Sequence, residues 1–432
     1  MEPDHPVAEA VAVAGDRIAA VGTDAEVLAL RTDRTTTVDL EGRTVLPGFI
    51  DSHAHWIGDR GVAGHETAEQ TIDEALRNGW TSISELFVNE ERLEELRQLD
   101  QSGDLRIRVN AYLPLSWQSE RFGDWYLRYE PGHEYSSRLR VAGVKLFVDN
   151  GPNIGYEGRE YWFTQEELTE LLRQADEAGF QIAVHAIVDL AIDTVLNSYE
   201  EILVGRPDLG HRHRIEHLVM LRDDQIARMR DLGLVASVQL SWVNSDWTEE
   251  ILRDPGPEKA PWVGRWRDLM EAGVHTIGGT DHPWTVVGTV GGSMKAIYQA
   301  VTKVGEQGLP PPSWMLSQAI DVQQALSLLT IDAAYGTFQE DIKGSIAVGK
   351  LADLVILSEN PRSVPSERIQ DVDVLLTLVG GGPEYCLEAS SLCPQVPLPS
   401  GARSDVKVER LVFDRQIAPA RATRTVRSGD VT

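Results

Sequence analysis

Two histidines separated by one residue are the clearest chemical feature of this chain. His53 and His55 stand at the end of an apolar run that is short enough to form a buried strand. Side chains two residues apart on a strand point the same way, so both imidazoles can face one centre. Such a pair suits zinc, manganese, iron or a similar divalent ion, although two surface histidines in a loop would give the same pattern.

Other ligand-type residues stand at the ends of further apolar runs. His185, His217 and Asp281 end three more runs, and Lys145 lies in a fourth. Each one alone is better explained as a structural residue. Five separate strands that bring such residues to one rim predict a shared metal site.

Lys145 needs its own explanation, because an ammonium group cannot ligate a metal and is costly to bury among cations. It could pair with Asp149 or Asp281, or extend its head group to solvent. Alternatively, it could react with CO2 to form a carbamate, an anion that bridges two metal ions. Its neighbours Val144 and Leu146 and the scarcity of lysine favour the carbamate.

The elements that must position these residues follow a repeated pattern, in which a polar helix ends near a glycine and a short apolar run follows. Gly79, Gly179, Gly233 and Gly273 each mark such a junction, and residues 164–167 form a capping box that begins a helix reaching residue 178. Eight strands are expected near residues 45–52, 80–86, 107–115, 141–148, 181–186, 213–218, 234–240 and 274–281. Eight strand–helix units predict a (β/α)8 TIM barrel, in which active sites lie at the C-terminal ends of the strands. A doubly wound sheet is disfavoured because its glycine-rich phosphate turn is absent after the first strand.

The flanks of the barrel are β-rich, which predicts one small composite β-sandwich built from both ends of the chain. The expected domains are 1–46 (N-terminal part of the sandwich), 47–335 (hydrolase barrel), 336–393 (C-terminal part of the sandwich) and 394–432 (linker and tail). The composition is globular, at 42% apolar and 25% charged residues in 432.

The surface is acidic, with a formal charge of −27, which disfavours nucleic acid and anionic membrane as partners. No apolar run is long enough to span a bilayer, and no secretory signal is visible. We therefore expect a cytoplasmic protein with a small-molecule substrate; its oligomeric state cannot be read from the sequence. The two cysteines, Cys386 and Cys393, are expected to be free thiols.

Three segments carry a family resemblance: LPGFIDSHAH (46–55), TIDAAY (330–335) and GSIAVGKLADLVIL (344–357). Together they resemble the amidohydrolase superfamily. VKLFVDNG (144–151) and SVQ (237–239) are similar to the YtcJ-like branch of amidohydrolase family 3, which includes N-substituted formamide deformylase.

The resemblance implies a TIM barrel with a β-sandwich and one or two metal ions, most often zinc. It implies that one ion is bound by His53, His55 and Asp281, and a second by His185 and His217, with carboxylated Lys145 as the bridge. The branch usually has a further N-terminal strand and a long insertion between the first two barrel strands. Here only residues 56–79 fill that interval, so a pocket wall known from relatives is expected to be missing.

The expected reaction is hydrolysis of a non-peptide C–N bond, in an amide or formamide. A bound ion lowers the pKa of water from about 15.7 toward 7, and Asp281 would act as general base and then general acid. Trp56, His282 and Trp284 adjoin the ligands and are candidate substrate contacts. Two alternatives stay open: a mononuclear deaminase of a nitrogen heterocycle, and a non-catalytic scaffold or binding protein.

Three more residues have weaker assignments. Glu85 could face the site or form a salt bridge at the rim. His211 and His213 are expected in a solvated loop before the sixth strand.

Overall fold

The eight expected strands are present in the computed structural model, as one parallel sheet that is nearly closed into a barrel. In sheet order the strands are β14 (Thr276–Gly279), β13 (Val235–Gln239), β12 (Arg214–His217), β11 (Gln181–Ala186), β10 (Leu139–Phe147), β7 (Arg108–Pro114), β6 (Trp80–Glu85) and β5 (Phe49–Ala54). The structure describes residues 7–117, 120–149, 162–206, 210–253, 255–284, 292–388, 390–393 and, for the backbone, 410–414. The predicted TIM barrel is confirmed.

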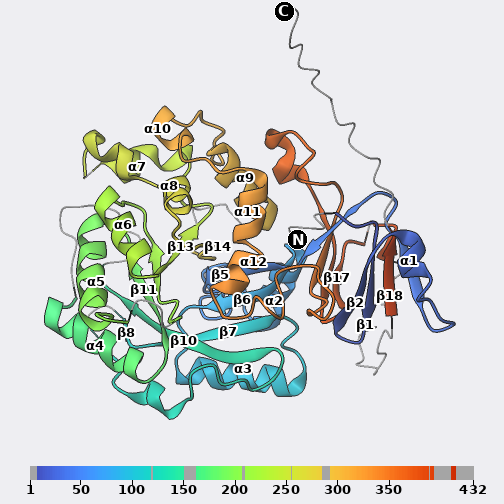
Figure 1. Cartoon of the computed structure of the whole chain (residues 1–432), viewed down its shortest axis with the longest axis horizontal. Coiled ribbons are helices and arrows are strands. Elements are labelled where there is room, and N and C mark those ends of the chain that lie inside the picture. The colour runs from blue at the N-terminus through green and yellow to red at the C-terminus, as the bar shows by residue number, and fades with distance from the viewer. Residues whose placement is uncertain are drawn as a thin grey trace, which may run out of the picture.

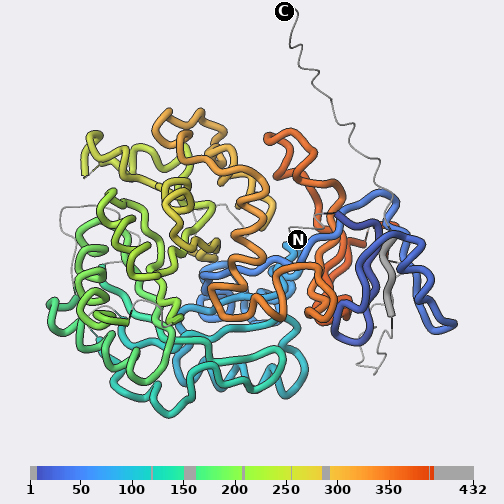
Figure 2. The backbone as a smooth tube through the Cα atoms, in the orientation of Figure 1, coloured from blue at the N-terminus to red at the C-terminus, as the bar shows by residue number. Residues whose placement is uncertain are grey.

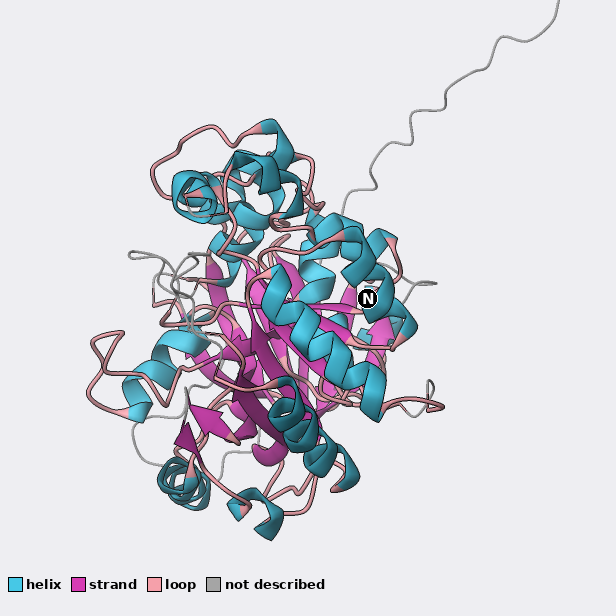
Figure 3. Cartoon of the chain, turned by 90° about the vertical axis from the view of Figure 1, so that its left-hand side faces the viewer, coloured by secondary structure: helices cyan, strands magenta, loops and turns pink. Residues whose placement is uncertain are grey.

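Helices surround the barrel, with the strands at the centre (Figures 1 and 3). They are α2 (Ala68–Arg77), α3 (Glu90–Ser102), α4 (Gln165–Glu177), α5 (Asp189–Ile202), α6 (Asp223–Asp231), α7 (Thr248–Leu252), α8 (Trp266–Glu271), α9 (Ser293–Thr302), α10 (Ser313–Leu316), α11 (Val322–Leu328) and α12 (Ile331–Tyr335). Short 3-10 helices span Trp125–Arg128, Ser245–Trp247, Pro257–Trp262 and Ser366–Asp371, and a small hairpin is formed by β8 (Ser116–Trp117) and β9 (Glu120–Arg121).

The predicted capping signals are confirmed. Thr164 caps α4 in a capping box with Glu167, and Gly79 and Gly179 take left-handed φ angles of 80° and 82° after their helices. At Gly79 a Cβ atom would also lie 3.0 Å from the ring of Phe49, so glycine is needed there for space as well as for conformation.

Two four-stranded sheets pack beside the barrel, and both ends of the chain contribute to them (Figure 2). The first has the order β2 (Arg17–Gly22), β1 (Ala10–Ala14), β18 (Arg410–Asp414), β3 (Thr36–Asp39), and the second β17 (Gly382–Cys386), β16 (Val374–Val379), β15 (Leu354–Leu357), β4 (Thr44–Pro47). Helix α1 (Asp24–Leu28) follows β2. Val11 and Val13 of the first sheet share a buried core with Leu354 and Ile356 of the second, as in a β-sandwich.

Two features near the C-terminus differ from the expectations. Residues 410–414 belong to the expected tail, yet they form β18 between β1 and β3; the rest of 394–432 lies outside the described residues. The expected free thiols are wrong, because Cys386 and Cys393 form a disulfide. The turn after β17 brings their Cα atoms to 5.8 Å, which is within the range that a disulfide spans.

The apolar run at 45–52 contains two strands rather than one. β4 pairs with β15 in the sandwich, and after Gly48 the chain enters the barrel as β5. Among the described residues, no helix is long and apolar enough to cross a membrane.

Candidate metal centre

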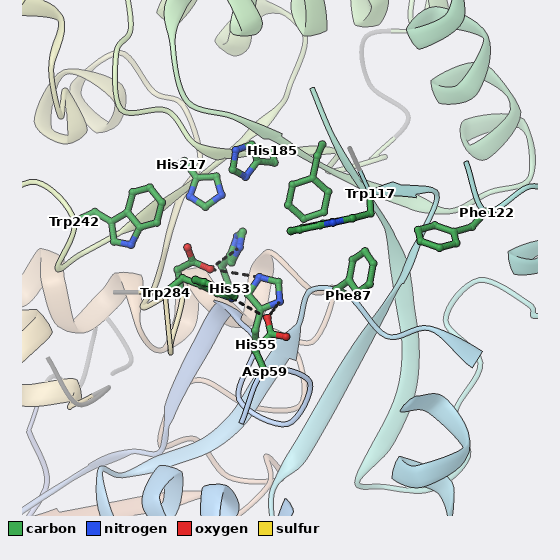
Figure 4. A pocket seen from close by; sticks show the side chains of 12 residues that line it. His53, His55, Asp59, Phe87, Trp117, Phe122, His185, His217, Trp242 and Trp284 are labelled. Atoms are coloured by element: carbon green, nitrogen blue, oxygen red, sulfur yellow. Dashed lines mark hydrogen bonds and ion pairs between the residues drawn. The ribbon is translucent and has the colours of Figure 1, made fainter. Parts of the chain in front are cut away.

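His53, His55 and Asp281 converge at the C-terminal end of the barrel, where the first and last strands meet. His53 lies in β5, His55 follows it, and Asp281 follows β14. One ligand atom from each lies within 4.8 Å of the others. Asp281 Oδ1 is 3.3 Å from His53 Nε2 and 3.4 Å from His55 Nε2 (Figure 4). The predicted convergence of this triad is therefore present.

Backbone contacts between β5 and the segment after β14 hold the triad. The Asp281 N–H donates to the His53 carbonyl at 2.7 Å, and the His55 N–H donates to the His282 carbonyl at 2.7 Å. A Cβ atom at Gly279 would lie 2.7 Å from the His53 nitrogen, so only glycine permits this approach. Asp281 itself has a φ of 59°, a strained value for a non-glycine residue.

Asp51 holds the segment after β14 through hydrogen bonds. Its carboxylate accepts from the Thr280 hydroxyl at 2.6 Å, from the Thr280 N–H at 2.8 Å and from the Trp56 indole N–H at 2.9 Å. Burial raises the pKa of Asp51 to about 6, although these donors oppose the shift. Asp51 therefore ties β5 to the turn that carries Asp281.

His185 and His217 form the opposite side of the centre. Their ring centroids are 4.3 Å apart, and His217 is 4.7 Å from His53. His217 Nδ1 lies 2.9 Å from Gln239 Oε1, and its buried Nε2 has no hydrogen-bond partner among the residues that the structure describes. His185 Nε2 lies 3.1 Å from Asp149 Oδ1. His217 has a φ of 79°, so the backbone is strained on this side too.

Lys145 is fully buried near these histidines. Its Nζ has no hydrogen-bond partner among the described residues and lies 4.7 Å from the centre of the Phe147 ring. The structure shows neither a pairing with Asp149 or Asp281 nor a solvent-exposed head group. Burial lowers the pKa of Lys145 to about 8, although Glu216 opposes that shift.

Burial keeps the histidines neutral. It lowers the pKa of His53 and of His217 well below the ordinary value, and neighbouring positive charge adds to the effect. The pKa of His55 falls to about 3 for the same reason. Burial raises the pKa of Asp281 well above its usual range, and Lys145 opposes this only in part. Neutral imidazoles with free nitrogen lone pairs are the form that binds divalent ions.

Glu216 is a residue of the centre for which the sequence analysis proposed no role. Its Oε2 lies 2.6 Å from His53 Nδ1, and both of its oxygens accept from Arg214. The sequence does hold a signal, because two charged residues two apart on a buried strand must share one face, here the barrel interior.

The triad opens into a cavity of about 440 Å³ with a largely aromatic wall. Phe87, Trp117 and Phe122 gather on one side of the histidines and Trp242 lies on the other (Figure 4). The described residues that line the cavity are His53, His55, Asp59, Phe87, Trp117, Phe122, Phe147, His185, His217, Trp242, Asp281 and Trp284. None of these twelve is a lysine or an arginine.

The three candidate substrate contacts lie in different places. Trp284 lines the cavity, and its indole N–H donates to Asp59 Oδ2 at 2.7 Å. Trp56 is buried outside the lining and stacks on His282, with ring centroids 3.8 Å apart. Trp56 and His282 thus support the turn after β14 from behind.

Two weaker expectations need correction. Glu85 is at neither the metal centre nor a salt bridge: it is buried and accepts from the N–H groups of Ile57 and Gly58, which follow the histidine pair. His213 is not in a solvated loop but is buried, with Nε2 3.2 Å from Asp176 Oδ1, while the half-buried His211 stacks on it. The pairing with Asp176 of α4 is long-range and invisible locally.

The residues present fit a divalent ion. His53 Nε2 and His217 Nε2 are buried nitrogen atoms with no hydrogen-bond partner in the described part of the chain, a costly arrangement unless a cation takes their lone pairs. Together with the carboxylate of Asp281, they form the nitrogen and oxygen donor set that zinc prefers.

Three curated proteins are similar to this chain in sequence. LONG AFTER FAR-RED 3 of Arabidopsis thaliana is 31% identical over 302 residues (66% of this chain, 49% of that protein). The putative amidohydrolase YtcJ of Bacillus subtilis is 30% identical over 216 residues, which cover 50% of this chain and 39% of that protein. The N-substituted formamide deformylase of Arthrobacter pascens is 26% identical over 351 residues, which cover 76% of this chain and 60% of that protein. The chain thus spans about half the length of the curated relatives it matches.

A family model and a solved structure extend the comparison. The model described as "Amidohydrolase family" matches residues 63–385. An uncharacterized metal-dependent hydrolase from Pyrococcus horikoshii superposes with a TM-score of 0.66 at 22% identity, covering 82% of this chain and 94% of that one. This structural likeness shows the fold.

Proposed function

The chain belongs to the amidohydrolase family, and from this premise we propose that it is a metal-dependent hydrolase of a non-peptide C–N bond, in an amide or formamide. The observation that carries the proposal is the triad of His53, His55 and Asp281, whose ligand atoms meet within 4.8 Å at the mouth of an aromatic cavity. The name of the relative from Arthrobacter pascens, a formamide deformylase, supports the bond type.

His53, His55 and Asp281 would hold the first ion. His185 and His217 would hold a second, and a carbamate on Lys145 would bridge the two. The Nζ of Lys145 is fully buried and has no hydrogen-bond partner among the described residues. This supports the carbamate, since it would replace a buried cation by an anion between two cations. Intact-protein mass spectrometry under native conditions tests it, through the mass of one added CO2 that is lost in Lys145→Met.

When bound, the metal supplies Lewis acidity toward the substrate carbonyl and lowers the pKa of the attacking water. The chain then supplies proton transfer. Asp281 accepts the proton of the water on its carboxylate and passes it to the nitrogen of the departing amine, as general base and then general acid. Thr280 donates two hydrogen bonds to Asp51, and these hold the turn that carries Asp281. The products are a carboxylate and an amine.

The cavity lining indicates the kind of substrate. Among the described residues that line the cavity, none is a cation that could bind a substrate carboxylate, and Asp59 would repel one. Its aromatic rings favour an uncharged amide with an apolar or aromatic group. Trp284 would contact that group directly, whereas Trp56 and His282 would act by supporting the turn behind the site.

One observation favours a second candidate, a mononuclear deaminase of a nitrogen heterocycle. Among the described residues, the histidines and carboxylates that cluster tightly enough for a metal are only His53, His55 and Asp281. Such an enzyme would bind one ion and would not need a modified Lys145. Metal analysis separates the two candidates, with two ions per chain for the amide hydrolase and one for the deaminase.

The test is an activity screen of the protein loaded with zinc, manganese or iron. The substrate panel contains N-formyl amines, N-acyl amino acids, lactams, dipeptides and amino-heterocycles, and product amine and ammonia are measured separately. We expect amine release from N-formyl amines or other uncharged amides, and none after chelation. Absence of both bound metal and hydrolysis would support the remaining alternative, a non-catalytic scaffold.

A further inference from the structure

A buried ion pair lies inside the barrel beneath the metal centre. Arg214 and Glu216 are adjacent inward-facing residues of β12, and both are fully buried. Arg214 Nε donates to Glu216 Oε1 at 2.7 Å, and Nη2 donates to Oε2 at 2.9 Å. The pair is therefore bidentate, the most directional form of the arginine–carboxylate interaction.

Such a pair is not explained by fold stability. The interior of a TIM barrel is normally filled by branched apolar side chains, and a buried ion pair often stabilises no more than apolar residues of the same volume. The contacts that the pair makes give another reason for its presence.

Both members of the pair contact the segment that carries the first metal-ligand histidine. Glu216 Oε2 lies 2.6 Å from His53 Nδ1, and Arg214 Nη2 donates to the carbonyl of Ser52 at 2.7 Å. A carboxylate can only accept, so His53 Nδ1 carries the proton and Nε2 keeps its lone pair. That Nε2 is the atom that lies 3.3 Å from Asp281 Oδ1.

Three hydrogen bonds hold the Glu216 carboxylate, and Glu216 is not among the described residues that line the cavity. Oε1 accepts from Arg214, and Oε2 accepts from both Arg214 and His53. Arg214 is held in turn by the Tyr112 hydroxyl at 3.1 Å and the Ser237 hydroxyl at 3.1 Å. The carboxylate is thus fixed behind His53, on the side away from the cavity.

We propose that Glu216 and Arg214 are positioning residues, which set the tautomer and ring orientation of His53 for metal binding. The inference rests on the metal site of the proposed function, and it extends that function to two residues that do not touch metal or substrate. Groups that bond the second nitrogen of a metal-ligand histidine typically contribute about 10- to 100-fold to metal affinity.

The chain offers a matched control. Arg108 and Asp353 form another buried bidentate pair, with distances of 2.7 and 2.9 Å, but Asp353 precedes β15 and neither residue contacts a ligand. Asp353→Asn therefore breaks an equivalent ion pair without touching the metal centre.

The experiment compares metal binding in the wild type with that in Glu216→Gln, Glu216→Asp, Arg214→Lys and Asp353→Asn. Each protein is stripped with a chelator and titrated with zinc against a competing indicator. The visible spectrum of the cobalt-substituted protein reports ligand geometry, and circular dichroism reports folding. We expect Glu216→Gln and Arg214→Lys to weaken zinc binding by about 10- to 100-fold and to change the cobalt spectrum. Asp353→Asn should change neither in the folded protein.

The remaining outcomes are also decisive. Glu216→Asp keeps the negative charge but moves the carboxylate away from His53, so it should weaken zinc binding. This variant replaces Glu216→Gln in the test if Glu216→Gln does not fold. Wild-type zinc affinity in folded Glu216 variants would overturn the inference, and so would an equal loss in Asp353→Asn. A wild-type protein that binds no metal would instead overturn the proposed function.

Discussion

Phe87 contacts three other aromatic residues of the cavity wall. Its replacement by leucine gives a quantitative test of the preference for aromatic substrates. The Phe87 ring makes edge-to-face contacts with Trp117, Phe122 and Phe147, at centroid distances of 5.5, 5.8 and 6.2 Å. Leucine keeps the apolar contact but removes the ring. An aromatic ring of the substrate would lose its contact with the Phe87 ring in this variant. One such aromatic pair contributes about 0.5–1.5 kcal/mol beyond area burial, which corresponds to about a 2- to 13-fold change in substrate binding.

We therefore expect Phe87→Leu to lower kcat/KM for N-aryl formamides by about 2- to 13-fold and to leave that for N-methylformamide unchanged. The three lost protein contacts also predict a reduced free energy of unfolding, so the assay runs well below the melting temperature of the variant. Phe180→Leu is the control, because it removes one edge-to-face contact, with Tyr126, at the opposite end of β11 from His185. Equal losses for aryl and methyl substrates, or the same selectivity change in the control, would refute the reasoning.

Three further predictions follow from the site and its supports. Asp281→Asn and Asp281→Ala should each lower turnover by at least about 100-fold while much metal stays bound, as measured by steady-state kinetics and metal analysis; near wild-type rates in either contradict the role of Asp281 in proton transfer. Burial raises the pKa of Glu85 from 4.5 to about 8, so the folded state holds a proton that the unfolded state has lost, and stability should fall as pH rises across that interval. Urea unfolding at about pH 5 and about pH 8 should show that the free energy of unfolding decreases with pH in the wild type, and decreases less in Glu85→Gln. Equal decreases in the two proteins would exclude Glu85 as the cause. Reduction of the Cys386–Cys393 disulfide should release two titratable thiols and lower the free energy of unfolding by about 2 kcal/mol, and thiols that titrate without reductant would contradict the bond.

The side chains that point into the barrel differ between the candidate metal centre and the layer beneath it. Towards the mouth the inward side chains are neutral imidazoles and a carboxylate, and beneath them lies the Arg214–Glu216 pair. Arg214 and Glu216 can stay buried because they form an ion pair with each other. Lys145 differs, because its Nζ has no hydrogen-bond partner among the described residues. This is why Lys145 is central to the question of one or two ions.

The sequence alone determined the features that depend on neighbours along the chain. The spacing of His53 and His55, the glycines after the helices and the eight apolar runs follow from strand and helix periodicity, which acts over a few residues. These local rules, with the known position of active sites in a TIM barrel, were enough to predict that His53, His55 and Asp281 lie together.

Only the tertiary structure decided which distant side chains meet. Glu216 reaches His53 across 163 positions in the sequence, and the aromatic wall combines Phe87 after β6, Phe147 of β10, and Trp117 and Phe122 of the β8–β9 hairpin and its flank. The disulfide and the burial of His213 depend on turns and helix packing in the same way. Such contacts are set by how the strands close into a barrel, and no short-range pattern in the chain encodes that geometry.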